Sequence, residues 1–250
     1  MRDIYLITMN EIRVTMRNPF WTVSSLFQPI MYLVLFGPLL NGVAGTNGLP
    51  GGNAIQFFAP GLLIMNALFG SAFEGFTLRD KLDSGFLERL RVTPISRLSL
   101  ALGFMLQSCL NLIIQSVVLI ACSFLFGLKL DPVGAIILVF LIVLIGITMS
   151  SISYRLGLMI REGGILAGIV NTFVLPMMIL SGIMLPISFG PPILQFIAQF
   201  DPFLYAVSAS RALVNGALFD ASIPIAFAVF AVLAVTTLAI FIHGMREAVA

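Results

Sequence analysis

Residues 78–97 read LRDKLDSGFLERLRVTPISR and form a charged stretch between two long apolar runs. The chain as a whole is strongly apolar: 59% of its 250 residues are hydrophobic, only 10% are charged, and the mean hydropathy is +1.08. A soluble domain carries about 25% charged residues, because water must solvate its surface. This chain has too few charged residues for water to solvate its surface in that way. The composition therefore predicts an all-α protein that crosses a membrane several times.

Six runs of the sequence are long and apolar enough to cross a bilayer as helices, which takes about 20 residues each. The fifth run contains Pro176, which spanning helices tolerate. An even number of spans puts both chain ends on the same side, and we treat residues 1–250 as a single membrane domain. The six predicted spans are 21–40, 57–76, 99–126, 133–153, 165–185 and 223–242.

The basic residues set the expected orientation, because Lys and Arg are enriched on the cytoplasmic side of membrane proteins. Eleven of the thirteen fall on the side of the chain ends, whereas Lys129 and Arg211 fall on the other. This bias predicts a multi-pass protein of the cell membrane with both termini cytoplasmic. We also expect the first residues to be retained, since no small-residue cleavage site follows a short apolar region.

Residues 186–222, between the fifth and sixth spans, are too many for a turn and too apolar for a soluble loop. They divide at Asp201-Pro202 into two pieces, each too short or too polar to cross a bilayer. We interpret them as a re-entrant or interfacial helical hairpin on the outer face. The alternative is a seventh span, which would place Arg211 in lipid.

Two further elements are expected on the cytoplasmic side. In residues 1–18, apolar side chains recur every three to four positions, which is typical of an amphipathic helix in the headgroup layer. The alternative is an ordinary cationic flank. In the central loop, Ser84 can cap a new helix and Pro94 can end it. This predicts a short helix within 84–93, the alternative being a solvated loop that only fixes topology.

The segment GFLERLRVTPISR, residues 85–97, resembles the coupling-helix signature of ABC-2 type transporter permeases, and more narrowly of the daunorubicin/doxorubicin-resistance group of drug exporters. The resemblance covers essentially the whole chain, including an outer segment from DPFLY at 201–205 to Gly216. It implies two permease chains, as a homodimer or a pseudo-dimer, that work with two ATP-binding-cassette ATPase subunits, which bind ATP and Mg²⁺. It also implies that the coupling helix contacts the ATPase subunit through Phe86, Leu87, Glu88, Arg89, Leu90, Arg91, Thr93 and Pro94.

The sequence carries neither an ATP site nor ion-coupling residues. Its two lysines follow Asp80 and Leu128, so no Gly-Lys-Ser/Thr phosphate loop exists in it. The centres of the six spans lack Asp, Glu, Lys, Arg and His, and the nearest exception, Glu74, is interpreted as structural. We therefore expect no catalytic residue, cofactor or metal in this chain, and transport driven by the separate ATPase subunit.

Uncharged polar residues occur inside several spans. They either hydrogen-bond neighbouring helices, which is the commoner role, or line a path for cargo. The resemblance and the 22 Phe favour efflux of a hydrophobic or amphiphilic drug, antibiotic or lipid, with polysaccharide or lipid-linked glycan as the alternative. Membrane lipids are expected partners and nucleic acid is not. The candidate pathway residues are Gln28, Asn66, Gln107, Asn111, Gln115 and Asn171.

Overall fold

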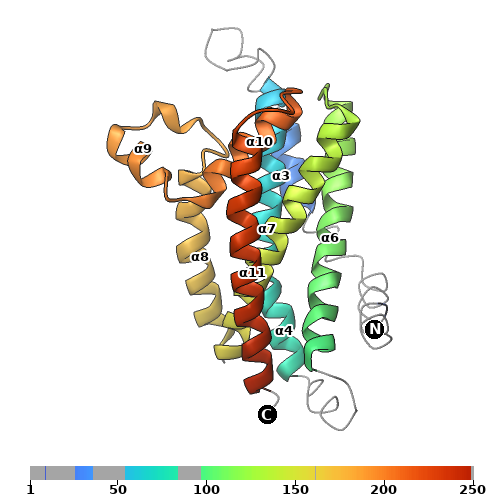
Figure 1. The fold of residues 1–250 in the computed structure, drawn as a ribbon, viewed down its shortest axis with the longest axis vertical. Helices are drawn as coiled ribbons and strands as arrows, with labels where there is room; N and C mark the ends of the chain where they lie inside the picture. The colour runs from blue at the N-terminus through green and yellow to red at the C-terminus, as the bar shows by residue number, and fades with distance from the viewer. Residues whose placement is uncertain (1–8, 10–25, 36–53, 84–96, 161, 249–250) are drawn as a thin grey trace.

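The computed structural model describes residues 9, 26–35, 54–83, 97–160 and 162–248 of the chain. Within these ranges the chain forms helices joined by turns, and no strand occurs. The long helices lie side by side in one elongated bundle (Figure 1). The all-helical class predicted from composition is confirmed.

Five helical stretches in the described ranges are long and apolar enough to cross a membrane, and they correspond to the second through sixth predicted spans. The helix Leu26–Leu35 is the described part of the first predicted span. The predicted amphipathic helix at 1–18 lies outside the described residues, apart from Met9. The count of six spans therefore stays a prediction.

The helices are α3 (Ala54–Ala72), α4 (Glu74–Asp83), α6 (Arg97–Leu125), α7 (Pro132–Met159), α8 (Gly163–Leu180), the 3₁₀ turn η1 (Ile187–Phe189), α9 (Pro192–Ala198), α10 (Pro202–Val214) and α11 (Ser222–Ala248).

Several helices end away from the predicted span ends. Helix α4 continues to Asp83, beyond the predicted end at 76, and helix α11 continues to Ala248, beyond the predicted end at 242. Helix α7 continues to Met159, beyond the predicted end at 153, because Tyr154 is buried among neighbouring helices rather than placed at the edge of the bundle. Helix α8 ends at Leu180, before the predicted end at 185. Gly182 follows with a φ of 72°, a left-handed conformation that glycine adopts without steric cost and that turns the chain.

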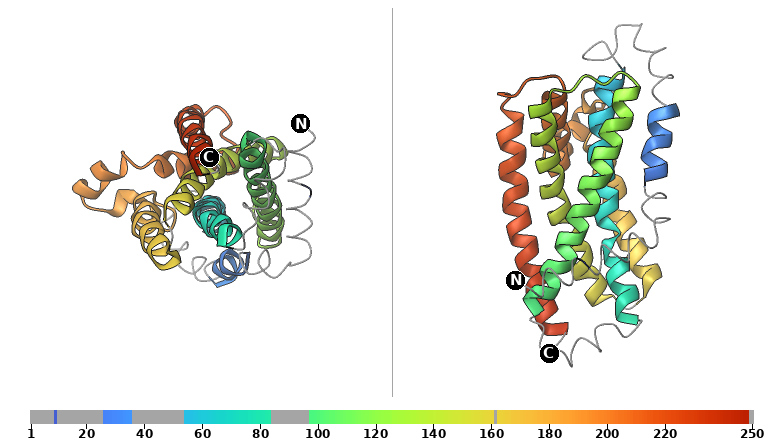
Figure 2. Two further views of the ribbon diagram at one scale, coloured as in Figure 1. Left: turned by 90° about the horizontal axis from the view of Figure 1, so that it is seen from below. Right: turned by 90° about the vertical axis from the view of Figure 1, so that its right-hand side faces the viewer.

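Helices α3 and α4 form the centre of the bundle. Of their most apolar stretch, 83% of the residues are buried, compared with 17% for α8 and 22% for α11. Seen along the bundle, α3 and α4 are surrounded by the other long helices (Figure 2, left). The exposed apolar faces of α8 and α11 are therefore left for lipid or for another protein chain.

Helices α4 and α7 touch backbone to backbone where two glycines face each other. The amide of Gly75 donates to the hydroxyl of Ser153 at 2.7 Å. A Cβ placed on Gly157 would lie 2.5 Å from the carbonyl oxygen of Gly75, which is closer than side chains approach. Small residues permit such close crossings of membrane helices. The position of α4 on α7 therefore depends on these two glycines.

Replacing Gly157 by Ala should lower the thermal unfolding midpoint of the purified chain by about 2–12 °C, because the added methyl group overpacks the α4–α7 contact. Gly168→Ala is the matched control. It lies inside α8, nothing lies within 4 Å of the added carbon, and Ala favours a helix more than Gly does. If Gly157→Ala melts at or above the temperature of Gly168→Ala, the close crossing does not stabilise the fold.

Candidate functional site

The eight residues predicted to contact the ATPase subunit, from Phe86 to Pro94, lie outside the described residues. The structure does describe the two helices that this segment connects. Helix α4 ends at Asp83, helix α6 begins at Arg97, and both ends lie at the end of the bundle where the C-terminus lies (Figure 1). We call this the C-terminal end and the opposite one the distal end. A force on residues 84–96 would reach α4 and α6 first.

Side chains from α4, α6, α7 and α11 meet in a buried cluster next to these helix ends. Tyr154 is at its centre: its ring centroid lies 6.2 Å from that of Phe104 and 5.2 Å from that of Phe241. Aromatic pairs at such distances attract each other beyond simple burial. We call this group the basal cluster. Its buried members are Leu78, Leu100, Ala101, Phe104, Met105, Tyr154, Phe241 and Met245.

Polar interactions also occur at the edge of the basal cluster. The hydroxyl of Tyr154 donates to Oε2 of Glu74 at 3.1 Å, and the ammonium of Lys81 lies 4.5 Å above the ring of Phe104. Arg79 pairs with Asp83 one turn away on α4. The hydrogen bond between Glu74 and the phenol of Tyr154 therefore connects α4 to α7. Tyr154 was not among the residues predicted from the sequence, although an aromatic residue with a polar tip at the end of an apolar run is a signal for such a contact.

The structure brings together two of the six candidate pathway residues. The amide of Asn66 on α3 donates to Oε1 of Gln115 on α6 at 3.0 Å, and both side chains are buried. Gln107 is also buried on α6, and Asn111 between them is half-buried. A second contact of this kind joins the hydroxyls of Ser108 and Ser150 at 2.7 Å. Hydrogen bonds of this type connect helices in membranes.

The other two candidates bond within their own helices. Gln28 is exposed and donates to the hydroxyl of Tyr32 at 3.4 Å. Asn171 is half-buried in α8 and donates to the carbonyl of Ala167 at 2.9 Å. The six residues therefore do not form one continuous polar surface on a single chain, and their role in a cargo path stays a prediction.

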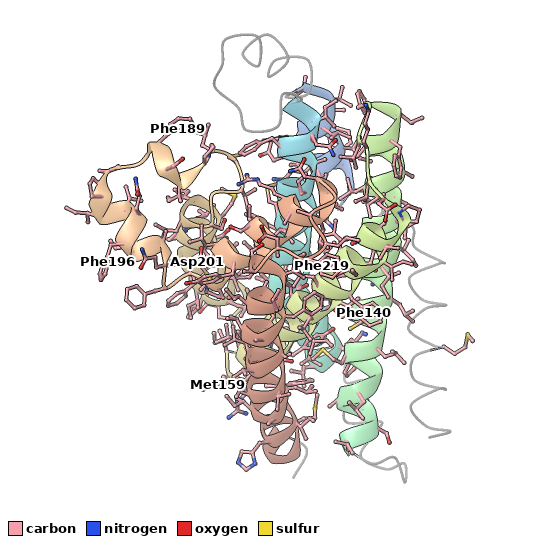
Figure 3. All side chains as sticks on the ribbon, turned by 45° about the horizontal axis from the view of Figure 1, so that its top comes forward. Phe140, Met159, Phe189, Phe196, Asp201 and Phe219 are labelled. Atoms are coloured by element: carbon pink, nitrogen blue, oxygen red, sulfur yellow. The ribbon has the colours of Figure 1, made fainter. Side chains whose placement is uncertain are left out.

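The predicted hairpin between the last two spans consists of η1, α9 and α10. It divides at Asp201-Pro202 as predicted: Asp201 caps α10 by accepting the amide of Phe203 at 3.0 Å. The loop that carries α9 projects sideways from the bundle, with Phe189 at its upper edge and Phe196 at its lower left in the view of Figure 3. Its re-entrant placement in a bilayer stays a prediction.

Asp201 is unusual because its carboxylate is buried and one oxygen, Oδ2, has no hydrogen-bond partner among the described residues. Burial raises the pKa of Asp201 to about 6, although the hydrogen bond from Phe203 opposes the shift. Burial disfavours the charged form of a carboxyl group.

Backbone carbonyls hold Arg211 on α10, and no carboxylate of the described residues forms an ion pair with it. Its guanidinium donates to the carbonyls of Gly182 at 2.8 Å and Ile183 at 3.3 Å, and it lies 3.8 Å from the ring centroid of Phe57. Burial lowers the pKa of Arg211 to about 10, so the side chain stays charged near neutral pH. These contacts fasten the hairpin to α3 and to the turn after α8.

A bundle of helices that are long and apolar enough to cross a bilayer, with buried polar contacts between them, defines a multi-pass membrane protein. The sequence model of the ABC-2 type transporter family matches residues 2–215, and the chain therefore belongs to this family.

Curated relatives agree with this assignment. The chain is 28% identical over 214 residues to "Putative transport permease ycf38" of Cyanophora paradoxa, covering 84% of this chain and 73% of that one. It is 30% identical to the protein of the same name from Porphyra purpurea, covering 78% and 68%. It is also 22% identical to "Daunorubicin resistance ABC transporter permease protein DrrB1" of Streptomyces coeruleorubidus, covering 79% and 70%. The resemblance to ABC-2 permeases and to the daunorubicin-resistance group is confirmed.

Tyr154→Phe should reduce the free energy of unfolding by about 1 kcal/mol, because it removes the hydrogen bond to the half-buried carboxylate of Glu74 and keeps the ring. In a Glu74→Leu background the same change should cost less, since that carboxylate is already gone. Thermal melts of the four chains measure the difference. An equal loss in both backgrounds would show that the hydroxyl stabilises the fold through another group.

Asp201→Asn should flatten the pH dependence of stability. The folded state holds the Asp201 proton more tightly than the unfolded state does, so stability is greatest below about pH 4 and falls as the pH rises to about 6. Asn keeps an acceptor for the amide of Phe203 but cannot ionise. The difference in Tm between the two proteins, measured at pH 4, 5, 6 and 7, should therefore grow up to about pH 6 in favour of the variant. A constant difference would contradict the assignment.

Proposed function

We propose that this chain is the permease subunit of an ATP-binding-cassette exporter that moves a hydrophobic or amphiphilic compound out of the cell. The observation that carries the proposal is the family match over residues 2–215, in a chain whose sequence has no phosphate loop of its own. An ABC-2 permease without an ATP site needs a separate ATPase subunit, which binds ATP and Mg²⁺ and hydrolyses the nucleotide.

In this proposal, residues 84–93 form the helix that sits in the ATPase subunit. Closure of the ATPase dimer on ATP would push this helix and, through it, the ends of α4 and α6. The basal cluster supports such a path, because Leu78 on α4 and Phe104 on α6 pack with Tyr154 on α7 and Phe241 on α11. Since packed cores shift between discrete arrangements rather than deform continuously, a small push there would move whole helices.

The cargo path lies between two copies of the chain in this proposal. The exposed faces of α8 and α11 leave apolar surface for a second copy. Of the candidate pathway residues, Gln28, Asn111 and Asn171 keep part of their side chains exposed on a single chain, which suits a path between chains. One relative is named for daunorubicin resistance, so an amphiphilic drug is the first cargo to test. Both termini are placed in the cytoplasm, following the bias of Lys and Arg.

The test is reconstitution of the purified chain in liposomes, with daunorubicin as cargo. The chain alone should move no drug against a gradient, because it has no energy source. Addition of the cognate ATPase subunit with ATP and Mg²⁺ should produce uphill transport. Uphill movement by the chain alone would overturn the proposal, and so would the failure of any cassette ATPase to bind it.

The same assay tests the coupling helix. Glu88→Ala together with Arg89→Ala should reduce transport per ATP hydrolysed by about 10-fold or more, a loss of about 1.4 kcal/mol or more in coupling, while membrane insertion stays normal. The matched control is Arg79→Ala with Asp83→Ala, which also removes one base and one acid but from a pair that is satisfied within α4. If both double variants transport alike, the contact with the ATPase subunit lies elsewhere.

A further inference from the structure

A polar pocket of about 670 Å³ opens at the distal end of the bundle, where α6 turns into α7. Three parts of the chain line it: Gln56 at the start of α3, Lys129 and Asp131 in the α6–α7 turn, and Asn215 directly after α10. Pockets that bind small molecules usually measure about 300–1,000 Å³. We call this the head pocket.

An apolar groove of about 410 Å³ lies between α6 and α7 on the membrane-facing side. It is lined almost entirely by carbon, with Ala121 and Phe124 from α6 and Ile136 and Phe140 from α7 among its walls. Ile136 and Phe140 are 62% and 68% exposed, and Phe140 lies on the side of the bundle where α6 runs (Figure 3). Phe124 lines both the groove and the head pocket, so the two cavities adjoin.

The floor of the head pocket is held in place by Gln56. Its amide nitrogen donates to the carbonyls of Lys129 at 2.6 Å and Val214 at 2.8 Å, and its amide oxygen accepts the backbone amide of Lys129 at 3.1 Å. These bonds use both the nitrogen and the oxygen of the Gln56 side-chain amide. They fix the backbone of the turn relative to α3 and α10 while leaving the Lys129 side chain exposed. A site whose backbone is fixed in advance binds a ligand at a lower entropic cost.

The head pocket holds two opposite charges that do not neutralise each other. In the described part of the chain, no carboxylate forms an ion pair with Lys129 and no base forms one with Asp131. One oxygen of Asp131 accepts the amide of Val133 at 3.2 Å as the cap of α7, and carboxylates can accept further bonds. A ligand that satisfies both residues carries an anion and a hydrogen-bonding cation close together, next to an apolar tail.

We propose that the head pocket and the groove together bind one zwitterionic phospholipid with a primary ammonium head group, of the phosphatidylethanolamine type. The phosphate lies at Lys129, the ammonium donates to Asp131, and one acyl chain occupies the groove between α6 and α7. A purely anionic phospholipid offers Asp131 no cation, and a choline head group has no N–H to donate. This site does not depend on the proposed export and requires only that the bundle lies in a bilayer.

The affinity of the purified full-length chain for single phospholipids, measured in detergent by native mass spectrometry, tests the proposal. Phosphatidylethanolamine should bind about 10-fold more tightly than phosphatidylglycerol with the same acyl chains, because its ammonium alone can donate a charge-assisted hydrogen bond to Asp131. Asp131→Asn can still cap α7 and should remove this preference. Lys129→Gln should weaken both lipids by about 10-fold.

A second variant tests the groove separately from the head pocket. Ala121→Trp should fill the groove and abolish tight binding of phosphatidylethanolamine, whereas Ala228→Trp, at an exposed alanine of α11, should leave it unchanged. A phosphatidylethanolamine with a photoreactive acyl chain should label residues 117–140. Equal affinity for both lipids, an unchanged preference in Asp131→Asn, or labelling outside these residues would each overturn the proposal and indicate ordinary annular lipid.

Discussion

The structure depends on the need to satisfy polar groups where no water is available. Lipid offers no hydrogen bonds and no hydrophobic driving force between helices, so the few polar side chains inside the bundle decide how the helices face each other. Asn66 bonds Gln115, the two serines at 108 and 150 bond each other, and Tyr154 bonds Glu74. Apolar packing fills the space around these bonds.

The two ends of the bundle satisfy their buried polar groups in different ways. At the C-terminal end, aromatic rings surround the Tyr154–Glu74 bond, and the contact lies next to the segment through which a motor subunit would act. At the distal end, side chains donate to backbone carbonyls of turns: Arg211 binds the turn after α8, and Gln56 binds the turn before α7. The first arrangement packs four helices together, and the second holds short non-spanning elements in place.

Much of the fold follows from local sequence. Apolar length places the second to sixth spans within a few residues, and Asp201-Pro202 predicts the division of the hairpin, because an Asp cap followed by Pro is a strong helix start. The ends of α7 and α8 were misplaced. Apolar length cannot show that Tyr154 has a buried partner on another helix, nor that Gly182 adopts a left-handed conformation. The best sequence signal for a partner contact, residues 84–93, lies where the structure describes nothing.

The sequence by itself determined that the protein lies in a lipid bilayer, that it is helical, and which family it belongs to. These properties follow from composition, from periodicity and from one short motif, all of which are local along the chain. Only the tertiary structure decided which polar groups meet. Asn66 and Gln115 are 49 positions apart, and Glu74 and Tyr154 are 80 positions apart. Such pairs depend on the rotation and crossing of helices, which many distant contacts set together, and a hydropathy profile carries no information about either.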